Sequence, residues 1–156
     1  MIPDNRKHRN IETKNDSRNK FGRSGEELAA RFLERKGYRL VVSNFRVPVG
    51  RNRKGVQVTG EIDIIALDGD ELCFIEVKSR SSEEFAPAIA AVNLRKQRQI
   101  IRAARAYRRI FNISGVEFRY DVVTIVKDKD DPAKIELTRG LWTEAKFRKR
   151  SWDGEF

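Results

Sequence analysis

Hydrophobic residues recur along the middle of the chain with the period of a helix or of a strand. Leu28, Phe32 and Leu33 have helical spacing, which predicts a helix from near Ser24 to Gly37. Ser24 and Glu27 match the Ser-x-x-Glu capping box of a helix start. Extended patterns predict strands at residues 38–49, 56–67, 72–80, 116–126 and 135–142, the last at a sheet edge.

A second, longer helix is predicted between the third and fourth strands. Asn93 can cap it, and it should run to about Phe111. Its expected inward stripe is Ile100, Ala103, Ala104, Tyr107, Ile110 and Phe111. Arginines cover the rest of this helix, namely Arg95, Arg98, Arg102, Arg105, Arg108 and Arg109. Pro87 suits the first turn of a short helix before it.

This order of elements predicts an α/β fold with a mixed central sheet flanked by helices. Residues 1–20 are polar and basic, and we expect a disordered tail there. The folded domain should span residues 21–143, followed by a basic C-terminal tail at residues 144–156. Two glycines place a basic turn at residues 50–55, the tip of a hairpin or loop.

Charged residues interrupt the two most apolar strands. Alternation in a strand puts Glu76 and Lys78 on one face, and Asp63 on one face of the preceding strand. A hairpin that pairs Leu67 with Leu72 across the loop 68–71 places Asp63 beside Glu76. It also brings Glu61 near Lys78. A shorter loop would put Asp63 beside Phe74, and an odd loop would separate the faces.

Two opposed carboxylates repel each other by roughly 3 kcal/mol at about 5 Å and an effective dielectric near 20. Lys78 offsets part of this cost, and a divalent cation such as Mg²⁺ or Mn²⁺ would offset more, since Mg²⁺ favours one or two carboxylates plus waters and phosphate. The alternative is a surface hairpin whose charges face water. The neighbouring Ile62, Ile64, Ile75 and Val77 favour buried strands, in which unpaired charges are rare.

Composition narrows the classes of function. Lys and Arg total 33 against 23 Asp and Glu, a formal net charge of +10 that suits a polyanion such as nucleic acid. Cys73 is the single cysteine and His8 the single histidine, which argues against a disulfide or a zinc cluster. We see no secretory signal and no apolar run of about 18 residues, so we expect a cytoplasmic protein that does not enter membranes.

Several other residues have open assignments. Glu26 lies near the inward side of the first helix, where it serves either the helix dipole or a site. Asp121 opens a buried-looking strand and is interpreted as structural, paired with Arg119 or Lys96. No histidine lies in the domain to activate Ser79, Ser81 or Ser82, so a Ser-His-Asp hydrolase is not expected.

The chain resembles a known family over residues 22–126. The matching stretches are Gly22-Arg-Ser-Gly-Glu26, Asn44-Phe-Arg46, Gly60-Glu-Ile-Asp63, Phe74-Ile-Glu-Val-Lys78-Ser-Arg80, Ala91-Val-Asn-Leu-Arg-Lys96 and Arg119-Tyr-Asp-Val-Val123. They resemble the bacterial UPF0102 (YraN-like) family. Asp63 and Glu76-x-Lys78 also look like the PD-(D/E)xK core shared by Holliday-junction resolvases and restriction endonucleases.

The resemblance implies an αβββαβ restriction-endonuclease-like core with Mg²⁺ at Asp63 and Glu76. It further implies a supporting role for Glu26, a catalytic role for Lys78, and a phosphate contact by Lys96. Arg95 and Arg80 are further candidate nucleic-acid contacts.

Two features depart from the family pattern. The segment Pro48–Thr59 looks longer than usual, and it is either an added DNA-contacting hairpin or an inert insertion, with the insertion slightly favoured. The Pro that leads the superfamily motif is replaced by Ile62.

The expected function is a metal-dependent DNA endonuclease, with branched DNA among the candidate substrates. One alternative is a non-catalytic nucleic-acid-binding protein of the same fold, acting in DNA processing or uptake. Another is an RNA-associated basic protein, although DNA is favoured over RNA. Related junction nucleases act as dimers, which makes a homodimer a candidate assembly.

Overall fold

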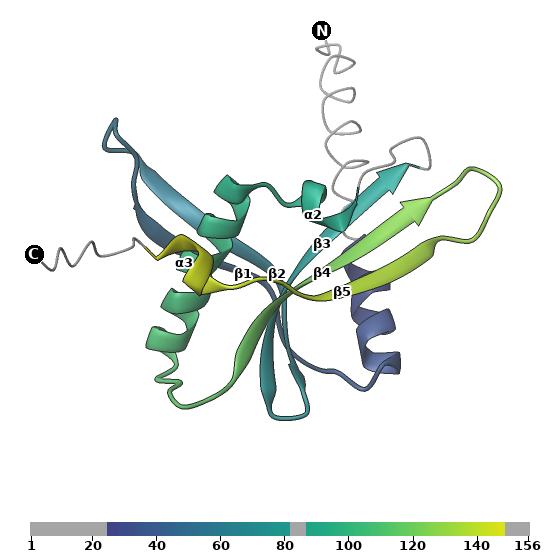
Figure 1. The fold of residues 1–156 in the computed structure, drawn as a ribbon, viewed down its shortest axis with the longest axis horizontal. Helices are drawn as coiled ribbons and strands as arrows, with labels where there is room; N and C mark the ends of the chain where they lie inside the picture. Colours follow the sequence, from purple (N-terminus) through teal and green to yellow (C-terminus); the bar gives the residue numbers. More distant parts are fainter. Residues whose placement is uncertain (1–24, 82–86, 149–156) are drawn as a thin grey trace, which may run out of the picture.

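The protein is built around one mixed five-stranded sheet (Figure 1). A computed structural model describes residues 25–81 and 87–148. The strands lie side by side in chain order: β1 (Arg39–Arg51), β2 (Gln57–Asp68), β3 (Glu71–Ser81), β4 (Phe118–Lys127) and β5 (Lys134–Trp142). Neighbours are antiparallel except β3 and β4, which are parallel and joined by a helical crossover. The predicted α/β class is confirmed.

Helices cover both faces of the sheet. Residues 25–35 form a helix whose Ala29 and Leu33 pack on the face that carries Ile64 and Ile75. It ends at Gly37, whose φ of +91° is the left-handed conformation of a helix C-terminus. The capping residue Ser24 lies outside the described residues.

The opposite face is covered by α3 (Leu94–Ile110), preceded by the short α2 (Ala88–Ala91). Asn93 caps α3 as predicted, and its side chain accepts a hydrogen bond of 2.8 Å from the Lys96 backbone N–H. Ile100 and Tyr107 lie in the core with Ile65 and Phe74 from the sheet.

The predicted inward stripe of α3 is wrong at its end. Ile110 and Phe111 are 55% and 56% exposed. Tyr107 closes the core by packing edge-on against Phe45 and Phe74, so the last turn of the helix projects past the sheet. The periodicity continued beyond the surface that it was expected to cover.

The β2–β3 hairpin has the predicted register. Leu67 pairs with Leu72, and Ile65 with Phe74. The expected loop of residues 68–71 is wrong, because Asp68 also pairs with Glu71 and the turn is residues 69–70. The shorter turn does not shift the register, since the added pair continues the same ladder. In the other direction the β2–β3 pairs stop at Ile64 and Ile75.

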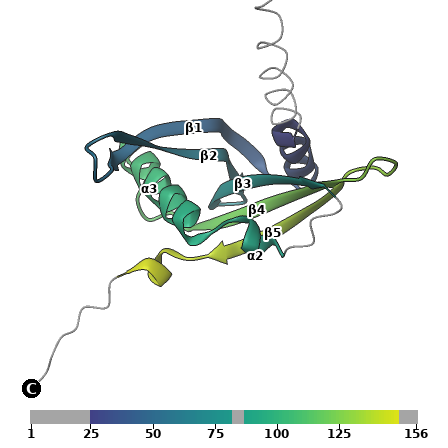
Figure 2. The same cartoon turned by 90° about the horizontal axis from the view of Figure 1, so that it is seen from above.

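Beyond that point β2 separates from β3 and continues as a pair with β1 to Arg51 and Gln57. We call this two-stranded extension, residues 45–62, the arm, and the point of separation the fork. Figure 2 shows the arm running over α3. Gly60 allows this close approach, because a Cβ there would lie 2.9 Å from Ala103 Cβ and 2.7 Å from Val49 Cγ1.

The fork also breaks the alternation of β2. Ile62 and Ile65 belong to the same core cluster, although strict alternation would send them to opposite faces. On β1, Asn44 adopts a positive φ of 54° between Ser43, which pairs with Ile64, and Phe45, which pairs with Ile62. Both strands therefore change phase at the level of Asp63.

Two clusters of charged side chains join elements at the edges of the fold. Arg119 donates hydrogen bonds to the carboxylates of Asp68, Glu71 and Asp121, which agrees with the structural interpretation of Asp121. Glu144 accepts hydrogen bonds from Arg105, Arg108 and the Tyr120 hydroxyl. Residues 144–147, assigned to the tail from sequence, thereby form a 3-10 helix, η1 (Glu144–Phe147), against α3. No helix in the described part is long and apolar enough to cross a membrane.

Candidate active site

The fork brings Asp63 and Glu76 together. Ile64 and Ile75 form the last β2–β3 pair, and Asp63 and Glu76 are the next residues on the two strands in the direction away from the turn. Asp63 Oδ2 accepts a hydrogen bond of 2.8 Å from the Val77 backbone N–H, which ties the departing strand to β3. Glu76 lies in the middle of β3, pairs with Val122 of β4, and is only 3% exposed. The predicted juxtaposition therefore arises where the ladder opens.

Two lysines lie against the carboxylate of Glu76. Lys78 Nζ is 3.4 Å and Lys96 Nζ 3.6 Å from Glu76 Oε1. The first lysine comes from the same strand and the second from the first turn of α3. Both remain partly open to solvent, with 36% and 29% of their side chains exposed. The site thus combines the buried Glu76 and the partly buried Asp63 with two lysines that are partly open to solvent.

The second oxygen of Glu76, Oε2, is buried and has no hydrogen-bond partner among the described residues. Such an atom is costly when the carboxylate is ionised. Burial and the nearby charge of Asp63 raise the pKa of Glu76 to about 7, although Lys96 and Lys78 oppose the shift. Protonated Glu76 can donate a hydrogen bond to Asp63. The pair needs a positive charge, supplied by a proton or a cation.

Asp63 shares this environment. Burial raises its pKa, while the hydrogen bond from Val77 and the charge of Lys96 oppose the rise. The two carboxylates are close enough to interact directly, so their titrations are linked.

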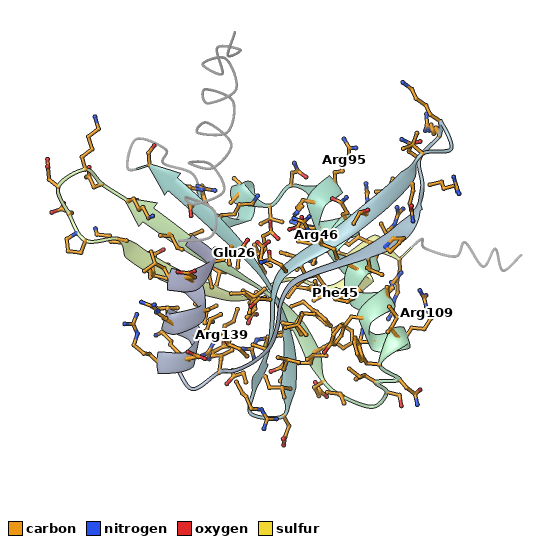
Figure 3. The ribbon with its side chains drawn as sticks, turned by 180° about the vertical axis from the view of Figure 1, so that it is seen from behind. Glu26, Phe45, Arg46, Arg95, Arg109 and Arg139 are labelled. Carbon is orange, nitrogen blue, oxygen red and sulfur yellow. The ribbon has the colours of Figure 1, made fainter. Side chains whose placement is uncertain are left out.

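Glu26 reaches the rim of the same site. It lies on the first turn of the helix at residues 25–35 and is half-buried (Figure 3). Burial raises its pKa, a hydrogen bond from Asn44 opposes the rise, and the charges of Asp63 and Glu61 add to it. Gly25 permits the approach, because a Cβ there would lie 2.7 Å from Ser79 Oγ on β3.

Asn44 is the site residue that the sequence analysis did not assign. Its side chain bonds to Glu26, and its left-handed backbone marks the phase change opposite Asp63. Asn is among the few residues that tolerate this conformation. Its presence in a matching family stretch was the available signal, but nothing local linked it to Glu26.

The remaining candidates lie around this centre. Arg95 is exposed at the start of α3 (Figure 3). Arg80 follows Lys78 by two residues on β3. Glu61, expected near Lys78, instead pairs with Arg46 across the arm at 3.3 Å. Lys96 contacts Glu76, so its positive charge already balances a carboxylate of the site in the absence of any bound nucleic acid.

The donor set suits a hard divalent cation. Across residues 25–81 and 87–148, no group of three His, Cys, Asp or Glu side chains could hold a metal ion. At the centre of the site, Asp63 and Glu76 offer carboxylate oxygens, and Glu76 Oε2 has no hydrogen-bond donor among the described residues. Mg²⁺ keeps several waters and takes few protein ligands, and the residues present fit that preference.

A mixed sheet in αβββαβ order, with an Asp and a Glu-x-Lys at a fork between its second and third strands, is consistent with the restriction-endonuclease-like class. The profile of the uncharacterised protein family UPF0102 matches residues 25–125. The chain belongs to the UPF0102 family.

Relatives of the family cover most of the chain. A UPF0102 protein of Chlorobium limicola is 44% identical over 115 residues, which are 74% of this chain and 81% of the relative. A UPF0102 protein of Desulfosudis oleivorans is 40% identical over 127 residues, which are 81% of this chain and 93% of the relative. These names carry no activity.

Proposed function

We propose that this protein is a metal-dependent DNA endonuclease. Its active site, where β2 separates from β3, would hydrolyse phosphodiester bonds. The observation that carries the proposal is the buried, unpartnered Oε2 of Glu76 beside Asp63. A protein that needed this pair only for stability would gain from replacing it with apolar residues. Two carboxylates held against each other, with a buried oxygen that no other group hydrogen-bonds, are the kind of strain that functional sites retain.

Each residue of the site has a role that fits this chemistry. Asp63 and Glu76 would hold Mg²⁺ or Mn²⁺, which supplies charge neutralisation for the phosphate and an acidified water. The Lys78 ammonium, partly open to solvent, would stabilise negative charge on the phosphate or orient the attacking water. Glu26 would accept a hydrogen bond from a water at the rim. Lys96 balances Glu76 and faces the substrate side.

The distribution of charge supports a nucleic-acid substrate. The stretches 35–60 and 88–116, which include most of the arm and all of α3, contain no Asp or Glu and seven Lys or Arg each. Arg95, Arg102 and Arg109 are exposed on α3 and have no carboxylate partner among the described residues. A basic surface beside a metal-binding pair suits a phosphodiester backbone.

Cleavage by highly purified wild type and Glu76→Gln protein, prepared side by side, tests the proposal. The substrates are branched, duplex and single-stranded DNA with Mg²⁺ or Mn²⁺. Gln preserves volume but removes the negative charge, so we expect cleavage to fall by at least about 100-fold while DNA binding is retained. Lys78→Ala should also abolish cleavage but preserve or improve metal binding, because a competing cation is lost.

A non-catalytic binding module predicts a different pattern. No wild-type cleavage would be detected, and Glu76→Gln would leave affinity unchanged or raise it, since a charge that repels phosphate is gone. Equal cleavage by both preparations would indicate a contaminating nuclease and would refute the enzymatic proposal.

A further inference from the structure

The tip of the arm is a cationic turn with a fixed shape. Asn52 Oδ1 accepts hydrogen bonds from the backbone N–H groups of Lys54 and Val56, at 2.9 and 3.0 Å. Arg51 Nη1 donates to the Gly55 carbonyl at 2.8 Å. Gly55 has a φ of +76°, which few other residues adopt. The turn is therefore ordered by its own polar groups.

Two cations at the tip have no structural task of this kind. The side chains of Arg53 and Lys54 are exposed and take part in no ion pair within the described residues. Between Arg39 and Gly60 the sequence contains no carboxylate that could neutralise them. Figure 3 shows the tip extending well beyond the body of the molecule.

The base of the arm is anchored on α3. Gln99 Nε2 of α3 donates to the Thr59 carbonyl at 3.1 Å, and Phe45 packs edge-on against Tyr107 with ring centroids 5.2 Å apart. Gly60 seats β2 directly on Ala103. These contacts fix the direction in which the arm leaves the sheet, so its charged tip is presented at a set distance from the fork.

We propose that the arm is a second contact for duplex DNA, in which Arg53 and Lys54 bind the phosphate backbone away from the cut. This inference deepens the proposed function and rests on it for the nucleic-acid substrate. Residues 47–59 contain no aromatic side chain on which unpaired bases could stack. The tip therefore suits the backbone of a double strand and carries no sequence preference.

The reach of the arm sets the scale of this contact. From Asp63 to Gln57, β2 advances by six residue steps, which is about 20 Å at about 3.3 Å per step. That length corresponds to about six base pairs along a duplex. The arm would thus extend the footprint about half a helical turn beyond the fork.

Binding of the full chain to a 30-base-pair duplex across a salt series, without divalent metal, tests the arm. The variant is Arg53→Gln/Lys54→Gln, and the matched control is Lys129→Gln/Lys134→Gln, two exposed cations near the β4–β5 turn. We expect the arm variant to flatten the log–log salt slope by about 1.8, or about 0.9 per lost phosphate contact. Its deficit relative to wild type should shrink about twelvefold between 50 and 200 mM salt.

The outcomes separate the two proposals. Wild type that binds with a salt slope equal to that of the arm variant overturns the arm alone. Wild type that does not bind DNA at any salt overturns the nucleic-acid function as well. An equal loss on single-stranded DNA of the same length refutes the duplex assignment. The charge-reversed Arg53→Glu/Lys54→Glu protein, which keeps Arg51 and Asn52, should lose more affinity than the Gln variant.

Discussion

The position of Glu76 in the fold explains its unusual chemistry. Its side chain is buried in the middle of β3, one oxygen faces two lysines, and the other has no partner among the described residues. The flanking Ile75 and Val77 pack in the hydrophobic cluster on the opposite face of the strand. The same apolar surroundings that make β3 a central strand therefore raise the pKa of Glu76.

This shift predicts the pH dependence of metal-free stability. Between the ordinary value of 4.5 and about 7, folded Glu76 keeps its proton while the unfolded chain has lost it. The folded state binds more protons there, so stability should fall as pH rises through this window. Glu76→Gln removes the effect, and its Tm should exceed that of wild type by about 5 °C at pH 8, with little difference at pH 5.

Thermal unfolding at both pH values, with and without 10 mM Mg²⁺, provides the measurement. Mg²⁺ should raise the Tm of wild type at pH 8 and have little effect on Glu76→Gln, because the cation replaces the missing proton between the carboxylates. If the Tm of the two proteins changed with pH in parallel, the pKa of Glu76 would not be raised in the folded state. An equal response to Mg²⁺ would place the cation elsewhere.

At the scale of elements, the fork depends on close contact between the arm and α3. The arm leaves the sheet at Asp63 and must be held in its new direction. Gly60 allows β2 to lie against Ala103, and Gln99 adds a hydrogen bond to Thr59. Asn44 allows β1 to change direction at the same level, through its positive φ. Gly25 allows the helix of residues 25–35 to lie close to β3.

Gly60→Ala should destabilise the protein by about 1–3 kcal/mol, because the new methyl group would overlap Val49 and Ala103. Ala103→Gly alone should cost up to about 1 kcal/mol through lost helix propensity. Combined with Gly60→Ala it should cost less than the sum, because it makes room. Urea unfolding of all four proteins gives the coupling energy. Strict additivity would show that the arm does not press on α3.

At the scale of the whole molecule, charge is segregated. Carboxylates gather at the β2–β3 turn, where Asp68, Asp70, Glu71 and Glu117 surround a shallow pocket. The arm and α3 are rich in cations, and within the described residues Arg53 and Lys54 of the arm and Arg102 of α3 have no carboxylate partner. Some arginines of α3 are already neutralised, since Glu144 of η1 pairs with Arg105 and Arg108. The basic surface is thus smaller than a count of arginines implies.

Two arginines of α3 provide a matched comparison. Both Arg102 and Arg105 are exposed, but only Arg105 has a carboxylate partner, at 3.2 Å. Arg102→Gln should flatten the salt slope of duplex binding by about 0.9, while Arg105→Gln should change it less, because Glu144 competes with phosphate. Fluorescence anisotropy on the same duplex measures both. Equal changes would show that Glu144 does not mask Arg105.

The sequence by itself determined the elements and the hairpin register. Period-two and helical spacing reflect local geometry, so they predicted the strands, the Asn93 cap and the pairing of Leu67 with Leu72. Those patterns also placed Asp63 beside Glu76. They overestimated the buried stripe at Ile110 and Phe111, because periodicity does not reveal where the covered surface ends.

Only the tertiary structure decided how the strands separate at the site. Alternation describes a continuous ladder, and β2 leaves its ladder with β3 at Asp63. The contacts of Glu26 with Asn44 and of Lys96 with Glu76 join elements far apart in the chain. So does the docking of Glu144 on α3. Such contacts depend on how close two packed surfaces come, which is set by small residues such as Gly25 and Gly60 and has no periodic signature in the sequence.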